Sequence, residues 1–377
     1  MKTYLVGGAV RDRLLGIPVY DRDWVVVGAS VEQMAALGYR PVGREFPVFL
    51  HPKTKEEYAL ARTERKSGHG YKGFEFYASP EVTLEQDLQR RDLTINAIAE
   101  DDEGNIYDPF GGQQDLQQQR IRHVSEAFAE DPLRVLRVAR FSSKLAHLGF
   151  RVAPETCQLM AAIAASGELE HLTRERVWAE LERSLTEPSP QRFFQVLKDC
   201  NGLQVLIPEL DLLLSGPESD TAITALQHCA SLNASAAATL ATLCRFISSD
   251  RSIVEPMLER LKAPRQFKDL CLLICQHADS LLHIEQLNAE QKLALYEGLD
   301  LQRRAERIPQ ITTSCRALAG LATMDEPFPQ EQQLQRLCKT INSIQPAALA
   351  AQGFKGKALG TELRRRRLQA LSQQEQA

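Results

Sequence analysis

The sequence has no apolar segment long enough to cross a membrane. No stretch of its 377 residues approaches the roughly 18 consecutive apolar residues that span a bilayer. The start, MKTYLVGGAVRD, contains only a very short apolar run, unlike the longer apolar core of a secretory signal peptide. We therefore expect a cytoplasmic protein that makes no membrane contact.

The sequence also lacks the patterns of a zinc site and of a basic nucleic-acid coat. Its eight cysteines form no Cys-x-x-Cys pair, so we interpret them as reduced, apolar side chains on helices. The formal net charge is −4, so any contact with nucleic acid must come from local basic patches.

The residues that are present divide the chain into two parts. Up to about residue 122, short β-branched and aromatic runs such as TYLV, DWVVVG and EYALA alternate with Gly, Pro and Asp, which is typical of strands in an α/β or α+β domain. From about Ser125 onward, apolar residues recur every three or four positions, which predicts helices. The segment SGPESD, residues 215–220, predicts a loop between helical groups.

The segment LVGGAVRDRLLG, residues 5–16, predicts a strand, a glycine turn and a short helix that ends at Gly16. Glycines at such a turn allow backbone N–H groups to approach an anion such as a phosphate. Arg11 stands one turn into this helix. It has two open interpretations, a bidentate contact with that phosphate or a solvated surface charge.

Two carboxylates follow in the segment YDRDW. Side chains alternate along a strand, so Asp21 and Asp23 are expected to leave the same face. This arrangement suits a pair of Mg²⁺ ions roughly 3.5–4 Å apart, one activating a hydroxyl and one holding a triphosphate. Asp-x-Asp alone is typical of solvated turn charges. After Gly-Gly-x-x-Arg-Asp at this spacing, it predicts a metal site.

Two later segments are rich in arginine. RRDLTINAIA, residues 90–99, predicts a capped apolar helix, in which Asn96 either discriminates a ribose or bonds to the backbone. EDPLRVLRVARF, residues 130–141, predicts a helix that begins near Pro132, where Asp131 could be only a cap. Three arginines at steps of three form a basic stripe on this helix, which favours an anionic partner: Arg134, Arg137 and Arg140.

Together with DPFGGQQDL, residues 108–116, these segments resemble the ordered motif set of bacterial class II tRNA nucleotidyltransferases, the CCA-adding enzymes. The resemblance runs from residue 2 to about residue 210. It implies an α+β fold, with a polymerase-beta-like nucleotidyltransferase head at residues 1–124, an all-α neck at 125–210, and an all-α body and tail at 211–377. It also implies template-independent addition and repair of the 3′-terminal CCA of tRNA from CTP and ATP, with release of pyrophosphate.

The resemblance further implies roles for single residues. Asp21 and Asp23 would hold Mg²⁺ and drive the tRNA 3′-hydroxyl into the α-phosphate of the nucleotide. Asp131 and Arg134 would read the base. The other expected CTP- and ATP-binding residues are Gly8, Arg11, Arg91, Arg137 and Arg140. Glu57 remains open to two interpretations, a third metal carboxylate or a solvated residue on an edge strand.

The resemblance also concerns the rest of the chain. The segment from Arg62 to Leu88 is polar and Gly-rich, which predicts a mobile loop, and in the family it helps to switch specificity from C to A. The body and tail are expected to bind the acceptor and T arms of tRNA. Many relatives carry in the body a phosphohydrolase domain whose metal is held by His-Asp pairs. None of the eight histidines here is followed by Asp, so we interpret this region as a degenerate, non-catalytic version.

Two alternative functions share these motifs. Poly(A) polymerase relatives tend to carry two basic residues after the Gly of PVGREFPVFLH, where this chain has Arg44 and then Glu45. A catalytically silent tRNA-binding protein would not require the full set of expected catalytic and base-reading residues, all of which are present. Both observations favour CCA addition.

Overall fold

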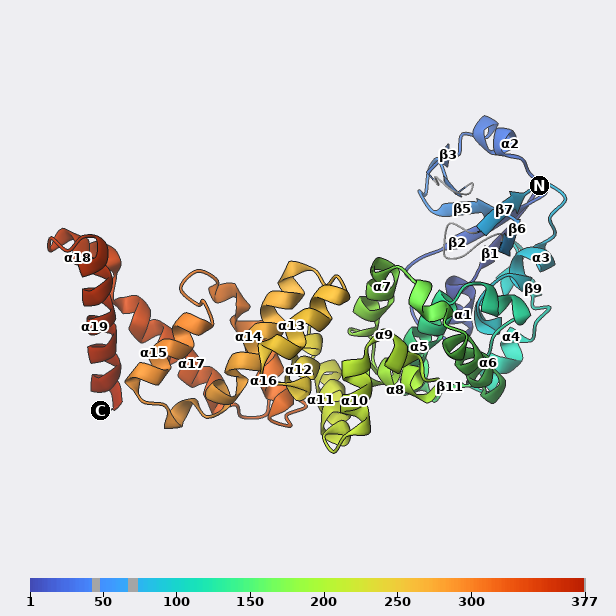
Figure 1. Cartoon of the computed structure of the whole chain (residues 1–377). Coiled ribbons are helices and arrows are strands. Elements are labelled where there is room, and N and C mark those ends of the chain that lie inside the picture. Colours follow the sequence, from blue (N-terminus) through green and yellow to red (C-terminus); the bar gives the residue numbers. More distant parts are fainter. Residues whose placement is uncertain (43–47, 67–73, 376–377) are drawn as a thin grey trace. The chain divides into compact units, whose positions relative to one another are not determined.

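The computed structural model describes residues 1–42, 48–66 and 74–375 (Figure 1). The chain divides into two compact units. Unit 1 comprises Met1–Ser184 and Arg192–Pro208, and unit 2 comprises Leu185–Gln191 and Glu209–Ala377. A sheet with its helices occupies the first third of the chain and helices dominate the remainder, so the fold is α+β, as expected.

A seven-stranded mixed sheet lies at the centre of unit 1, with the strand order β3-β4-β5-β2-β1-β8-β9. Strand β1 pairs antiparallel with β2, and β2 pairs parallel with β5. These three strands confirm the predictions from TYLV, DWVVVG and EYALA. The seven strands are β1 (Lys2–Val6), β2 (Asp23–Val27), β3 (Arg40–Pro41), β4 (Val48–Leu50), β5 (Glu57–Leu60), β8 (Ala99–Glu100) and β9 (Ile106–Tyr107).

Both faces of this sheet are covered. Tyr4 and Val25 pack on one face with Leu88 of helix α3 (Leu84–Gln89). Val26 packs on the other face with Met34 of helix α2 (Val31–Ala36). Because successive side chains of a strand point to opposite faces, the apolar run of β2 serves both cores.

The segment from Arg62 to Leu88 contains regular structure, so the prediction of a loop is wrong for its described residues. Strands β6 (Arg62–Lys66) and β7 (Phe74–Ala78) pair antiparallel over five residues, and α3 follows. The polar strand β6, RTERK, satisfies its backbone groups by pairing with β7, FEFYA, and the composition of the whole segment does not reveal this pairing. Residues 67–73, and likewise Arg44 and Glu45, lie outside the described residues.

The predicted helix within residues 90–99 is also wrong. The structure has a single 3₁₀ turn at Thr94–Asn96, followed by β8. The backbone N–H of Thr94 donates to the carbonyl of Arg122, and Leu93 forms an isolated bridge with His123. The backbone of this buried segment therefore finds its partners in a neighbouring chain segment, which competes with a continuous helix.

The remaining elements up to residue 206 are mainly helices. Helix α5 packs against α7, and most sides of α5 carry buried residues. The elements are α1 (Gly8–Leu14), α4 (Gly112–Gln117), α5 (Leu133–Leu145), α6 (Pro154–Ala165), α7 (Arg174–Ser184), α8 (Gln191–Asp199), α9 (Gly202–Leu206), the parallel pair β10 (Arg120–Ile121) and β11 (Arg151–Val152), and 3₁₀ turns at Glu126–Glu130, Ala146–Leu148 and Glu168–His171.

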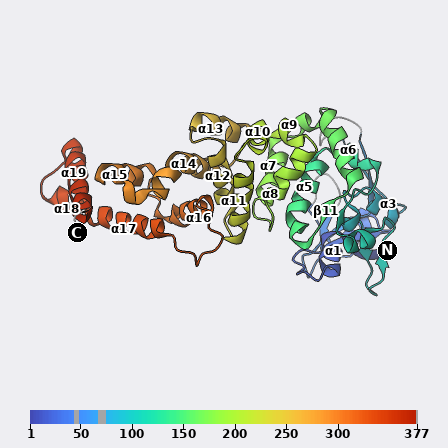
Figure 2. The same ribbon diagram turned by 90° about the horizontal axis from the view of Figure 1, so that it is seen from below.

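Unit 2 is helical where it is described. Its helices α12, α14 and α16 pack on one another, and so do α15, α17 and α19 near the C-terminus (Figure 2). The predicted loop at 215–220 falls between α10 and α11. The helices are α10 (Pro208–Ser215), α11 (Ser219–Ser231), α12 (Ala236–Ile247), α13 (Arg251–Arg260), α14 (Arg265–Leu282), α15 (Ala289–Gly298), α16 (Ile308–Leu318), α17 (Pro329–Ser343), α18 (Pro346–Ala351) and α19 (Gly356–Glu375), with 3₁₀ turns at Ile284–Gln286 and Ala305–Arg307.

Two expectations about composition can be compared with this structure. All eight cysteines have free thiols, six of them buried, which confirms their interpretation as apolar packing residues. Among the described residues, we find no helix that combines the length and the apolar character needed to cross a membrane.

Candidate active site

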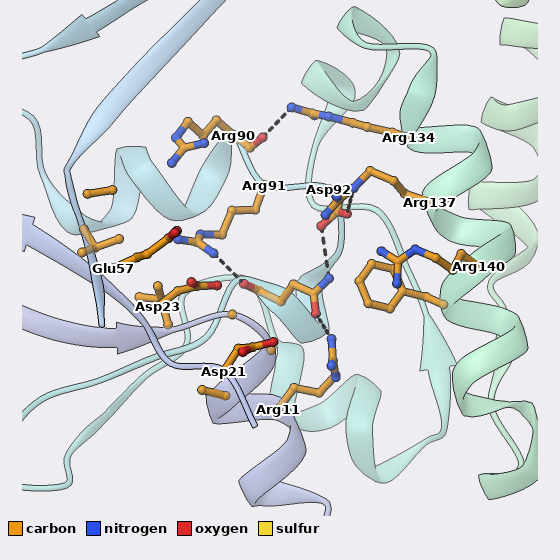
Figure 3. A pocket seen from close by; sticks show the side chains of 18 of the residues that line it. Arg11, Asp21, Asp23, Glu57, Arg90, Arg91, Asp92, Arg134, Arg137 and Arg140 are labelled. Carbon is orange, nitrogen blue, oxygen red and sulfur yellow. Dashed lines mark hydrogen bonds and ion pairs between the residues drawn. The ribbon is translucent and has the colours of Figure 1, made fainter. Parts of the chain in front are cut away.

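A cavity of about 740 Å³ lies within unit 1, between the β1–α1 turn, the starts of β2 and β5, the segment 90–96, and helices α5 and α7 (Figure 3). All ten residues expected to bind the metal or the nucleotide line it, although they come from separate parts of the chain, and Asn96 lines it too. The ten are Gly8, Arg11, Asp21, Asp23, Glu57, Arg91, Asp131, Arg134, Arg137 and Arg140.

Three carboxylates stand on the sheet side of the cavity. Asp23 is the first residue of β2 and is paired in register with Glu57, the first residue of β5, so the two side chains leave the same face of the sheet. Asp21 precedes the strand by two residues and does not belong to it, which corrects the predicted placement on one strand. Strand β5 lies between β4 and β2, so Glu57 is exposed but not on an edge strand.

The charges around Asp23 are partly balanced. Burial and the neighbouring charge of Asp21 raise the pKa of Asp23, while the guanidinium of Arg91 opposes both effects.

Within the described residues, no group of three or more His, Cys, Asp or Glu side chains is close enough to form a complete metal cage. Magnesium commonly takes only one or two carboxylates from a protein and completes its shell with water and substrate phosphates. Two aspartates and a nearby glutamate, all oxygen donors, fit that ion.

The glycine turn brings the backbone close to an arginine. Gly7 has φ 70° and ψ −130°, a conformation that only glycine adopts easily. A Cβ atom at Gly7 would lie 3.1 Å from Nη1 of Arg91, and one at Gly8 would lie 3.5 Å from Nη2 of Arg11. The predicted helix α1 ends as expected, with Gly16 at φ 70° just beyond it.

Arg11 is 3% exposed, so its interpretation as a solvated surface charge is wrong. Its Nε donates to Asp12 at 2.8 Å, and its Nη1 donates to the side-chain oxygen of Asn96. The side-chain nitrogen of Asn96 donates in turn to Asp92 at 3.2 Å. Asn96 therefore bonds two charged side chains, an arrangement that neither of its two predicted interpretations included.

Arg91 is anchored by an aspartate that the sequence analysis missed. Asp87 is fully buried, accepts Nη2 of Arg91 at 3.2 Å and forms a 2.6 Å ion pair with Arg90. Its spacing of three and four residues from these arginines on a helix was a signal that could have identified it. Nε of Arg91 is buried and has no hydrogen-bond partner in the described chain. The guanidinium thus keeps an unsatisfied donor beside the cavity, which favours an anionic ligand.

Asp131 has two partners. One carboxylate oxygen accepts the backbone N–H of Leu133 at 3.1 Å, and the other accepts Nη2 of Arg176 at 2.9 Å. The first contact is a local turn at the start of α5, as the cap interpretation predicted, but the second ties Asp131 to α7. Arg134 donates to the carbonyl oxygens of Ala127 and Arg90 at 2.9 and 2.6 Å.

The other two arginines of the stripe are paired as well. Nε of Arg137 donates to Asp92 at 2.7 Å, and Nε of Arg140 donates to Glu180 of α7 at 2.6 Å. Burial alone would raise the pKa of Asp92, but beside Arg137 it falls to about 2. The guanidinium carbons of Arg11, Arg137 and Arg140 lie 4.5–5.8 Å from the ring centre of Phe141.

The lining of the cavity carries more positive than negative charge. Beyond the predicted residues, the structure adds five basic side chains that sequence reasoning did not place there: Arg62, Arg90, Lys144, Arg176 and Arg183. In total, ten Arg and Lys residues face six Asp and Glu residues. A ligand with several negative charges, such as a triphosphate, would balance this excess.

The chain is similar to known proteins over nearly its whole length. The Poly A polymerase head domain family matches residues 3–122, and the family described as the probable RNA and SrmB-binding site of polymerase A matches residues 149–214. The chain is 49% identical to the Multifunctional CCA protein of Vibrio vulnificus (strain YJ016) and 52% identical to the CCA-adding enzyme of Pseudomonas putida (strain W619). Each alignment covers 98% of both proteins.

A solved structure is similar over nearly the whole chain. The crystal structure of the Bacillus stearothermophilus CCA-adding enzyme in complex with CTP has a TM-score of 0.73 and 27% sequence identity. The match covers 99% of this chain and 89% of that one.

Proposed function

Because this chain belongs to the CCA-adding tRNA nucleotidyltransferases, we propose that the cavity of unit 1 is where it joins nucleotides to tRNA. The enzyme adds the 3′-terminal CCA of tRNA from CTP and ATP without a nucleic-acid template. One observation supports the location: ten residues predicted from separate segments line one cavity that has a basic excess.

Transfer in this family depends on a divalent metal ion. We assign Mg²⁺ to Asp21 and Asp23, whose donors are oxygens, and Glu57, paired in register with Asp23, lines the same cavity. When bound, the metal lowers the pKa of the attacking hydroxyl and neutralises charge on the triphosphate.

The basic residues position the triphosphate. Arg91 lines the cavity with one hydrogen-bond donor unsatisfied, and the Gly8 turn and Arg11 line it as well. Arg137 and Arg140 add charge from α5. The 3′-oxygen of tRNA bonds to the α-phosphorus, the bond from that phosphorus to the bridging oxygen breaks, pyrophosphate leaves, and the hydroxyl proton is lost to solvent. Chain residues contribute mainly position and electrostatic stabilisation.

Asp131 and Arg134 read the base. Cytosine and adenine both carry an exocyclic amine, whereas uracil and guanine carry a carbonyl oxygen at the equivalent position. The carboxylate oxygens of Asp131 accept a hydrogen bond from the amine and repel the carbonyl. Arg176 and the backbone of Leu133 hold the carboxylate in place from two sides. Arg134 uses two of its five N–H donors on backbone carbonyls, which orients its guanidinium at the cavity wall.

The helical second half binds the acceptor and T arms of tRNA. The reaction takes place in the cytoplasm. In the basic run of α19, Arg365 and Arg366 share Glu362, and Arg367 is buried, so the run is less available to phosphates than its sequence suggests. Contacts with RNA phosphates weaken as salt is raised.

A direct test uses a tRNA transcript that ends before CCA. The protein is incubated with Mg²⁺ and each NTP alone or combined, and the product ends are sequenced. We expect addition of C, C and A in that order, followed by arrest. Long A tails from ATP alone on RNA without a tRNA fold would instead identify a poly(A) polymerase, and binding without extension would identify a silent tRNA-binding protein.

A further inference from the structure

Tyr20 is an aromatic residue that lines the cavity and has no role in the reaction described above. Its side chain is 88% exposed, the highest value for any large apolar side chain among the described residues, where Leu212 follows at 73%. It lines the same cavity as the carboxylates and directly precedes Asp21. Within the described part of the chain, we find no hydrogen bond or ring contact that holds its ring.

Other aromatic rings of this unit are used for packing. Trp24 stacks on Tyr58 with ring centres 5.4 Å apart, and its Nε1 donates to Glu56. Tyr39 meets Tyr58 edge-on at 5.1 Å. Tyr20 takes no part in this cluster, so folding does not account for an exposed aromatic ring at this position. A ring that lines a ligand cavity without a packing partner can stack on a planar group of the ligand.

Two bases come close to the carboxylates during transfer, that of the incoming nucleotide and that of the 3′-terminal nucleotide of tRNA. Asp131 and Arg134 on α5 read the incoming base, which leaves the terminal base of the primer. Consecutive Cα atoms are about 3.8 Å apart, so the backbone of Tyr20 lies next to that of Asp21, which the proposed function places at the 3′-hydroxyl. We propose that Tyr20 is a positioning residue that stacks on the 3′-terminal base of the tRNA primer. This inference rests on the proposed function of the cavity.

Stacking also suits the changing substrate of this reaction. The terminal base of the primer changes during the reaction. The first C is added to a primer that ends before CCA, the second C to a primer that ends in C, and A to a primer that ends in CC. Hydrogen-bond readout would favour one of these primers over the others. An aromatic ring accepts each of them, because every base has a flat π-face.

The test compares Tyr20→Ala and Tyr20→Leu with Tyr20→Phe. The primers are tRNA transcripts that end before CCA, after C and after CC. Loss of one base stack should raise KM for tRNA about 5- to 150-fold in the first two variants, with KM for CTP unchanged. Tyr20→Phe keeps the ring and should match wild type. Tyr107→Ala, an aromatic residue of β9 that does not line the cavity, is the matched control.

A spectroscopic measurement separates stacking from a general structural effect. A tRNA transcript that carries 2-aminopurine as its terminal base should lose fluorescence on binding to wild type and Tyr20→Phe, but not on binding to Tyr20→Ala or Tyr20→Leu. Unchanged KM and equal quenching in all four proteins would overturn the assignment. If wild type itself adds no CCA, the proposed function fails instead, so the two failures can be told apart.

Discussion

The ion pair between Asp92 and Arg137 is expected to be a major source of stability in unit 1. Asp92 is 6% exposed and accepts three donors: Nε of Arg137 at 2.7 Å, Nδ2 of Asn96 at 3.2 Å and the backbone N–H of Leu93 at 2.9 Å. A fall in its pKa from 3.8 to about 2 means that folding favours the ionised form by about 2 kcal/mol. Removing the arginine leaves a buried carboxylate without its counter-charge.

We therefore expect Arg137→Met to lower the free energy of unfolding by about 2–3 kcal/mol at pH 7, less than the usual cost of breaking a fully buried ion pair, because the side chain of Arg137 is 35% exposed. Asp92→Asn should cost less, because the amide is neutral and Arg137 can be hydrated. The double variant should lose about 2 kcal/mol less than the sum of the single losses. Arg151→Met, an exposed arginine of β11, is the control and should stay within about 0.5 kcal/mol of wild type.

The assay is urea unfolding followed by tryptophan fluorescence. The chain has only two tryptophans, and both Trp24 and Trp178 lie in unit 1, so the signal reports that unit. Because the pKa of Asp92 is depressed in the folded state, its stabilisation is complete above about pH 5 and is largely lost as the pH falls through about 2. The difference between wild type and Asp92→Asn should shrink over that interval. A loss below about 1 kcal/mol in Arg137→Met, without coupling in the double variant, would refute this reasoning.

Three further predictions concern activity. Asp21→Ala or Asp23→Ala should abolish nucleotide transfer and leave tRNA affinity nearly unchanged, as measured by primer extension and filter binding, and near-normal extension would contradict the metal assignment. Asp131→Ala should admit UTP or GTP into products, because a lost base contact removes roughly 1–3 kcal/mol of discrimination; a loss of thermal stability with intact selectivity would show that Asp131 is only a cap. The purified protein should not hydrolyse 2′,3′-cyclic nucleotides with Ni²⁺ or other metals, and hydrolysis that copurifies with it would show that the second half is catalytic.

Several features of the fold could be predicted from the sequence because their causes are local. The apolar runs of β1, β2 and β5 give strands through alternation, and the glycine pair followed by Gly16 marks the bounds of α1. The steps of three between Arg134, Arg137 and Arg140 place them on one helix. These patterns depend on residues that are neighbours in the chain, where period and backbone preference decide the conformation.

The hairpin of β6 and β7 and the single turn at Thr94–Asn96 were not predicted, because their backbone partners lie outside the local sequence pattern. The same limit applies to the partners of the arginines. Arg11 meets Asn96 across 85 positions, and Asp131 meets Arg176 across 45.

The sequence by itself therefore determined the residue types of the site, the family and the local elements that carry the site. The tertiary structure alone decided which carboxylate holds which arginine, that Arg11 is buried, and that Tyr20 stands unpartnered at the cavity. The physical reason is that burial and charge pairing depend on contacts between distant segments, and a buried guanidinium must find its counter-charge wherever the fold places one.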